Sequence, residues 1–200
     1  MNNIKLELPN TILIDEEVMF DENVLIRPNT IIKGKCKIGK NVIIGPNTEI
    51  INSEIGDNSL VRHSLVSDSK IGKNVTVGPF AHLRNGVVID DDIRVGNYVE
   101  IKNSVIEKNT KISHLSYVGD AFIGENVNIG AGVITANFDG KNKNKTIIKK
   151  DCFIGSNSTL IAPIVIEENS IVAAGSTLNK DVPSSSLAIA REYQLNKKRK

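Results

Sequence analysis

The chain has 200 residues, of which 40% are hydrophobic, and a formal net charge of +2 at pH 7. This length and composition fit one soluble domain, and the nearly balanced charge argues against nucleic acid as a partner. No apolar run approaches membrane-spanning length, and Met1 is followed by polar residues instead of a secretory signal. We therefore expect a cytoplasmic protein that binds neither nucleic acid nor membrane.

Residues 1–13 precede any regular pattern and are expected to form an irregular lead-in. From residue 14 to about residue 182, an aliphatic residue recurs nearly every sixth position, as in IDEEVM, FDENVL, IGKNVI and IGPNTE. Asn and Gly, which tolerate left-handed backbone angles, recur between the aliphatic positions, so each hexad predicts a short strand and a tight corner. Such repeats bury their apolar side chains only by stacking on one another.

This pattern resembles the hexapeptide repeat of left-handed parallel β-helices, in which three hexads make one triangular coil. The resemblance implies an all-β domain over residues 14–182, with roughly nine coils, one looped insertion and a short C-terminal tail at residues 183–200. Low aromatic content and the absence of Trp suit the narrow interior of such a prism. Cys36 and Cys152 fall on the small inward position of their hexads, so we expect buried thiols with no redox or metal role.

Two cationic residues mark the middle of the chain. Arg84 follows Leu83 and Lys102 follows Ile101, both at a hexad position where Gly is common. They are 18 residues apart, one full coil, so their side chains should lie one above the other on the same face. Adjacent cations repel. The pair is therefore either a solvated surface feature or a site where a bound anion, such as phosphate, offsets the repulsion.

Histidine occurs only at positions 63, 82 and 114. His63 and His114 are about three coils, or roughly 14 Å, apart, so one chain cannot close a histidine metal site, although ligands pooled across subunits remain possible. His114 stands out because Tyr117 and a looped insertion follow it. It is either an ordinary surface histidine or a general base that takes a proton from an amine.

The hexad rhythm breaks once, between Thr135 and Ile148, where TANFDGKNKNKT adds about seven residues. A β-helix ejects such a segment from one corner, where it is either a plain surface loop or reaches a neighbouring coil or subunit. Gly130 and Gly132 lack the third glycine and the strand-to-helix context of a dinucleotide fingerprint. They are interpreted as repeat glycines that leave backbone amides accessible.

The ordered motifs GPFAHLRNG, VGNYVEIKNS, SHLSYVGDA, IGENVNIGAGVITANFDGKNKNKT, FIGSNSTLIAP, VAAGSTL and LAIAR cover about residues 9–191. They resemble the acetyltransferase domain of the bacterial bifunctional UDP-N-acetylglucosamine pyrophosphorylase/glucosamine-1-phosphate N-acetyltransferases. The resemblance implies a cytoplasmic homotrimer that moves acetyl from acetyl-CoA to glucosamine 1-phosphate, for UDP-N-acetylglucosamine and cell-envelope synthesis. It implies no metal requirement for acetyl transfer. The uridylyltransferase half is expected to be missing from this chain.

The resemblance also implies roles for individual residues. His114 is expected to be the catalytic base. The residues expected to bind the sugar phosphate are Arg84, Lys102, Tyr117, Asn128 and Lys143. Those expected to line the acetyl-CoA groove are Ala131, Asn137, Phe138, Ser156, Ala174 and Arg191, with the backbone amide near Ala131 stabilising the oxyanion. Phe138 stands where the family usually has tyrosine, which implies one hydroxyl fewer against the coenzyme.

Two other functions stay open at this point. One is an acyltransferase of the same fold that acts on another amino sugar or on a nucleotide sugar. The other is a non-catalytic or metal-binding β-helix. A panel of amino-sugar acceptors separates the first from the glucosamine 1-phosphate enzyme, and metal analysis of the purified protein tests the second.

Overall fold

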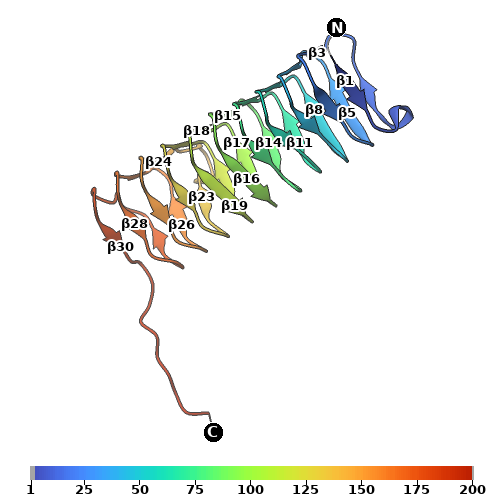
Figure 1. Cartoon of the computed structure of the whole chain (residues 1–200). Helices are drawn as coiled ribbons and strands as arrows, with labels where there is room; N and C mark the ends of the chain where they lie inside the picture. Colours follow the sequence, from blue (N-terminus) through green and yellow to red (C-terminus); the bar gives the residue numbers. More distant parts are fainter. Residues whose placement is uncertain (1–2, 200) are drawn as a thin grey trace.

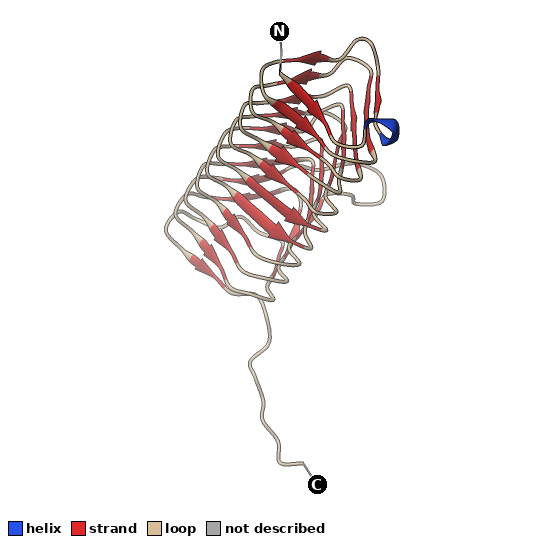
Figure 2. Cartoon of the chain, turned by 45° about the vertical axis from the view of Figure 1, so that its right-hand side comes forward, coloured by secondary structure: helices blue, strands red, loops and turns tan. Residues whose placement is uncertain are grey.

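The computed structural model describes residues 3–199, and its chain winds as a left-handed parallel β-helix. The coils stack along one axis from the N-terminus to the C-terminus, and the last residues leave the stack as an extended tail (Figure 1). Within the described part of the chain, the only helical element is the 3₁₀ turn η1 (Pro9–Thr11), at the N-terminal end (Figure 2).

Three sheets form the walls of the prism, and every strand pairing within them is parallel, as in β5 with β8 and β17 with β20. Sheet A contains β1 (Ile4–Leu6), β4 (Val24–Ile26), β7 (Ile43–Ile44), β10 (Leu60–Val61), β13 (Thr76–Val77), β16 (Arg94–Asn97), β19 (Lys111–His114), β22 (Asn128–Ile129), β25 (Phe153–Ile154), β28 (Ile171–Val172) and β30 (Leu187–Ala188).

Sheet B contains β2 (Leu13–Ile14), β5 (Thr30–Lys33), β8 (Thr48–Ile51), β11 (Leu65–Ser67), β14 (His82–Arg84), β17 (Glu100–Lys102), β20 (Tyr117–Gly119), β23 (Ile134–Ala136), β26 (Thr159–Ile161) and β29 (Thr177–Leu178). Sheet C contains β3 (Met19–Phe20), β6 (Lys37–Ile38), β9 (Glu54–Ile55), β12 (Lys70–Ile71), β15 (Val88–Ile89), β18 (Val105–Ile106), β21 (Ala121–Ile123), β24 (Thr146–Ile148) and β27 (Ile164–Ile166).

The prism is longer than the sequence pattern predicted. Between residues 3 and 199, the sheets have 11, 10 and 9 strands, which gives about ten turns instead of roughly nine. The extra length comes from both ends, because β1 pairs with β4 inside the expected lead-in and β30 pairs with β28 inside the expected tail. Residues 1, 2 and 200, which begin the lead-in and end the tail, lie outside the described residues.

The alternation of side chains along each short strand explains the core. Successive side chains of a strand point to opposite faces, and the inward position of each strand is aliphatic. Ile26, Ile32 and Ile38, from three consecutive strands of one coil, are at most 2% exposed. Cys36 and Cys152 are also buried, as predicted, and their burial raises the pKa of both thiols.

Asparagine forms the predicted tight corners. Asn41, Asn58 and Asn74 all have a positive φ and follow one another along the corner between sheets C and A. The side-chain amide of Asn41 donates to Asn58 at 2.9 Å, and that of Asn58 donates to Asn74 at 3.3 Å. The corner residues thus adopt the left-handed conformation and also bond one coil to the next.

The insertion leaves the prism between β23 and β24, at the corner between sheets B and C. Partners in neighbouring coils are usually 16, 17 or 18 residues apart, as the hydrogen bonds between coils show. Across the insertion the spacing rises to 25 residues, as between Asn126 and Asp151. The predicted break of about seven residues is therefore confirmed.

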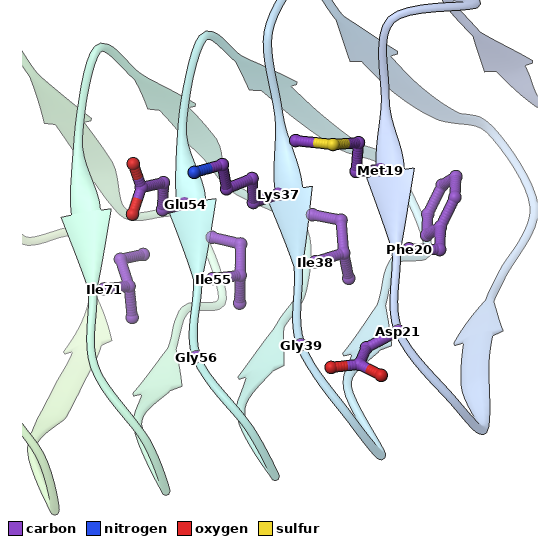
Figure 3. Close-up of a pocket in the computed structure, with 10 residues that line it drawn as sticks. All are labelled: Met19, Phe20, Asp21, Lys37, Ile38, Gly39, Glu54, Ile55, Gly56 and Ile71. Carbon is purple, nitrogen blue, oxygen red and sulfur yellow. The ribbon is translucent and has the colours of Figure 1, made fainter.

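A shallow groove lies on sheet C in the N-terminal coils, across β3, β6, β9 and β12. Met19, Lys37 and Glu54 line it from neighbouring strands, and Gly39 and Gly56, which follow Ile38 and Ile55, also line it (Figure 3). None of the predicted site residues lines this groove.

Candidate functional site

Sheet B carries the predicted cation pair. Arg84 at the end of β14 and Lys102 at the end of β17 are register partners, which confirms the spacing argument. Tyr117 begins the next strand of the sheet, and the register partner of Lys102 there is Gly119. A Cβ atom at Gly119 would lie 2.5 Å from the Tyr117 hydroxyl oxygen. The missing side chain therefore gives the Tyr117 ring the space to lie along β20 over Gly119, the register partner of Lys102.

Arg84 is not an unpaired cation. Its Nε and Nη2 atoms donate to Glu100 Oε1 at 2.9 and 2.6 Å, in an ion pair whose partners are 31% and 36% exposed. The expected repulsion between Arg84 and Lys102 is thereby largely compensated. Glu100 is not among the residues predicted from the sequence, although it lies one coil before Tyr117 and is its register partner. Lys102 itself is only 8% exposed.

The insertion brings a second cation to Lys102. The nearby Lys102 amine lowers the pKa of Lys143, while Asp120 and Tyr117 act in the opposite direction. Lys143, Asp120 and Asn103 line one pocket at the corner between sheets B and C. Two converging ammonium groups near a phenol are chemically suited to bind an anion.

His114 ends β19 of sheet A and lies on the corner between sheets A and B, where the strands of sheet B begin. Lys102 lies where those strands end. Its side chain is exposed, and its Nδ1 atom is 2.6 Å from Asn97 Oδ1. An amide oxygen accepts hydrogen bonds and cannot donate them, so this contact places the proton on Nδ1 and leaves Nε2 free to accept one. Asn97 was missed by sequence reasoning, although it lies one coil, 17 residues, before His114.

Four of the residues predicted to bind the coenzyme continue this A–B corner beyond His114. Ala131, Ser156 and Ala174 follow it in successive coils, each tied to the next through backbone hydrogen bonds of the corner. Arg191 comes next, against the following turn of the corner. Because Ala and Ser are small, the backbone of this corner is accessible along its length.

The structure does not bring all the predicted residues together. Asn128 points outward from sheet A, in register with Lys111, and so lies on another wall of the prism than Tyr117. Asn137 and Phe138 are at the base of the insertion, on the B–C corner, and not on the A–B corner with the other coenzyme residues. Asn137 is 7% exposed and Phe138 60% exposed.

Between residues 3 and 199, no group of three or more His, Cys, Asp or Glu side chains is arranged to hold a metal ion. In the same range, no helix has the length and hydropathy needed to cross a membrane.

Family models match three consecutive parts of the chain. Residues 21–52 match the bacterial transferase hexapeptide repeat, and residues 145–180 match the hexapeptide repeat of succinyl-transferase. Residues 69–142 match the GMPPB C-terminal domain. The chain belongs to the hexapeptide-repeat transferase family. The candidate site thus lies on a member of this family, and the three matched parts of the chain belong to one solenoid.

Two relatives share about half of the residues of this family member. The bifunctional protein GlmU of Clostridioides difficile (strain 630) is 48% identical over 197 residues, which cover 98% of this chain and 43% of that protein. The bifunctional protein GlmU of an Exiguobacterium species is 52% identical over 189 residues, covering 94% and 42%. The chain therefore spans less than half the length of these curated relatives.

Solved structures of the same fold include two acyltransferases. Arabidopsis UDP-N-acetylglucosamine acyltransferase superimposes with a TM-score of 0.73 at 15% identity, over 88% of this chain and 69% of that chain. The Francisella novicida UDP-N-acetylglucosamine acyltransferase gives a TM-score of 0.69 at 18% identity, over 92% and 66%. At these identities the likeness concerns the fold alone.

Proposed function

We propose that this chain is an acetyl-CoA-dependent N-acetyltransferase that converts glucosamine 1-phosphate to N-acetylglucosamine 1-phosphate. One observation carries the proposal: Lys102 and Lys143 converge where the strands of sheet B end, at the B–C corner, while His114, with Nε2 free to accept a proton, lies where they begin, at the A–B corner. The similarity to one part of the bifunctional GlmU proteins supports it.

The acceptor lies across sheet B in this proposal. Its phosphate binds between the Lys102 and Lys143 ammonium groups, and the Tyr117 hydroxyl donates a further hydrogen bond to it. Arg84 stays paired with Glu100 and contributes its charge at a greater distance from the phosphate. The amine of the sugar then points toward the A–B corner and His114.

Acetyl transfer needs one base and one polarised carbonyl. The amine nitrogen attacks the carbonyl carbon of the acetyl thioester while His114 Nε2 takes its proton, so that a C–N bond forms. The backbone amide of Ala131, the next residue on the corner, donates to the oxyanion. When the C–S bond breaks, the protonated ring returns the proton to the leaving sulfur. Asn97 Oδ1 holds the Nδ1 proton throughout and stabilises the imidazolium.

The coenzyme extends from this point along the A–B corner, over Ala131, Ser156 and Ala174, toward Arg191. Asn128, on sheet A, and Asn137 and Phe138, on the B–C corner, reach a coenzyme on the A–B corner only from a second copy. We therefore place the site between neighbouring prisms of a homotrimer, with acetyl-CoA touching two chains. Acetyl transfer in this arrangement uses no metal ion.

The test is CoA release with a panel of acceptors: glucosamine 1-phosphate, glucosamine 6-phosphate, glucosamine and a UDP-linked amino sugar. We expect glucosamine 1-phosphate to have the highest kcat/KM, with EDTA having no effect. Light scattering in the assay buffer should give the mass of three chains. A preference for the nucleotide sugar, or full activity in a single chain, would contradict the proposal.

A further inference from the structure

We infer that Asp120 is a positioning residue that fastens the insertion, residues 137–145, to sheet B and so holds Lys143 beside Lys102. This inference rests on the proposed function, because it gives the insertion its part in binding the sugar phosphate. Neither the hexad pattern nor the motif resemblance singles out Asp120, which follows β20 at the B–C corner.

Asp120 contacts both ends of the insertion. At the first end, Asn137 Nδ2 donates to Asp120 Oδ2 in a short hydrogen bond. At the second end, the backbone N–H of Thr146 donates to the Asp120 carbonyl oxygen at 3.2 Å. On the prism side, the Asp120 N–H donates to the Lys102 carbonyl oxygen at 3.0 Å, and Asn103 Nδ2 donates to Asp120 Oδ1 at 2.5 Å. Asp120 thus joins β17, the strand that carries Lys102, to both ends of the insertion.

The interior of the insertion is held together by its own bonds. Asp139 Oδ1 accepts from the N–H groups of Lys141 and Asn142, at 2.8 and 2.7 Å. The N–H of Asn144 donates to the Asn137 carbonyl oxygen at 2.7 Å, and an antiparallel bridge closes the turn. The insertion is therefore a preformed turn, and its placement over sheet B depends on the contacts at its two ends.

Charge points to the same role. Burial acts to raise the pKa of Asp120, but the hydrogen bonds from Asn103 and Asn137 and the positive charges of Lys102 and Lys143 outweigh it and lower the pKa. The carboxyl group is consequently ionised at neutral pH. Its negative charge offsets part of the repulsion between the two lysines, which otherwise drives the loop away from the sheet.

Asp120→Asn removes the charge with little change of shape. Asp120 has a φ of 49°, a conformation that asparagine also tolerates, so the corner can keep its backbone. Asp68 provides a matched control on the same corner: its φ is 48°, and it accepts a hydrogen bond from Asn52 Nδ2 at 3.4 Å. It lies several coils from the insertion. Asp68→Asn should therefore change stability without changing the phosphate site.

The kinetic test separates positioning from general damage. With glucosamine 1-phosphate as acceptor, Asp120→Asn should raise the acceptor KM about 10- to 100-fold, because it breaks a hydrogen bond to a charged group and frees the loop. The KM for the acceptor and the KM for acetyl-CoA should both stay the same in Asp68→Asn. Adding Asp120→Asn to Lys143→Met should cost little beyond Lys143→Met alone, since both changes remove the same contact. Full additivity would overturn the inference.

Hydrogen exchange gives a second measurement that needs no activity. The amides of Asn144 and Thr146 should exchange faster in Asp120→Asn than in the wild type, and at the wild-type rate in Asp68→Asn. If the wild type acetylates no sugar phosphate, the proposed function fails, yet the exchange rates still report on the fastening of the loop. Equal exchange in Asp120→Asn and the wild type would overturn the inference whatever the acceptor turns out to be.

Discussion

The contact between Asn97 and His114 offers a sharp test of the proposed base. In Asn97→Ala the ring loses the acceptor that holds its Nδ1 proton, at 2.6 Å in the structure. The bond strengthens when the ring becomes positively charged during reaction, and a hydrogen bond to a charged group is worth about 1.5–3 kcal/mol. Both residues are reached by solvent, so we expect the lower part of that range.

This free energy corresponds to a fall in kcat of about 10- to 30-fold, with each 1.4 kcal/mol giving about one factor of ten. The KM for either substrate should change little, because the bond gains strength only in the transition state. The assay is steady-state CoA release under saturating acetyl-CoA, with a thermal unfolding scan to verify that the variant is folded.

Asn97→Asp is the informative companion variant. It keeps an acceptor at the same position, so at raised pH the kcat of Asn97→Asp should recover most of what Asn97→Ala loses. A carboxylate beside the ring favours the protonated imidazole, which leaves the base free only at higher pH. If folded Asn97→Ala keeps kcat within about twofold of the wild type, the contact has no part in catalysis and the orientation argument is wrong.

Three further predictions follow from the structure. His114→Ala should lower kcat about 10²- to 10⁴-fold with little change in substrate binding. Lys102→Ala should instead act mainly on the KM of the sugar phosphate, because a charge contact that is made both before and during the reaction stabilises the ground state and the transition state equally. Steady-state kinetics with varied acceptor distinguish the two variants. Gly96→Ala should destabilise the protein by about 1–3 kcal/mol in urea unfolding, since a Cβ there overlaps the carbonyl oxygen of Ser113 on the strand that ends in His114; an unchanged midpoint would show that β16 and β19 adjust freely. Backbone hydrogen bonds within the insertion lower the pKa of Asp139 from 3.8 to about 2. The contribution of the ionised carboxyl group to the order of the loop is therefore complete above about pH 4 and is lost as the pH falls through about 2. An NMR titration of this carboxyl group with a midpoint near 4 would contradict this.

Much of the fold follows from the sequence because a β-helix is close to one-dimensional. Each hexad occupies one wall of the prism, so the hexad period alone predicts which side chains point inward and which residues stack. This explains why the register of Arg84 with Lys102, the burial of Cys36 and Cys152 and the place of the insertion are confirmed. The hexad period underestimates the length of the prism, because the terminal coils pair without a clear hexad pattern.

The period fails where coil length varies. Asn97 and His114 are 17 residues apart, so a count of 18 places Asn97 opposite Leu115 and hides its contact with the imidazole. Whether a coil has 16, 17 or 18 residues depends on how tightly each corner turns. That depends on contacts between coils and not on the hexad itself.

The sequence by itself determined the solenoid, the stacked positions on sheet B and the one interruption, because these depend on a local and repeated pattern of residue types. Tertiary structure alone decided that Arg84 pairs with Glu100, that Lys143 lies beside Lys102, and that Asp120 contacts both ends of the insertion. The physical reason is that an insertion carries no period: its position is fixed by a few specific hydrogen bonds and charges, whose partners come from different coils and meet only once the chain has wound.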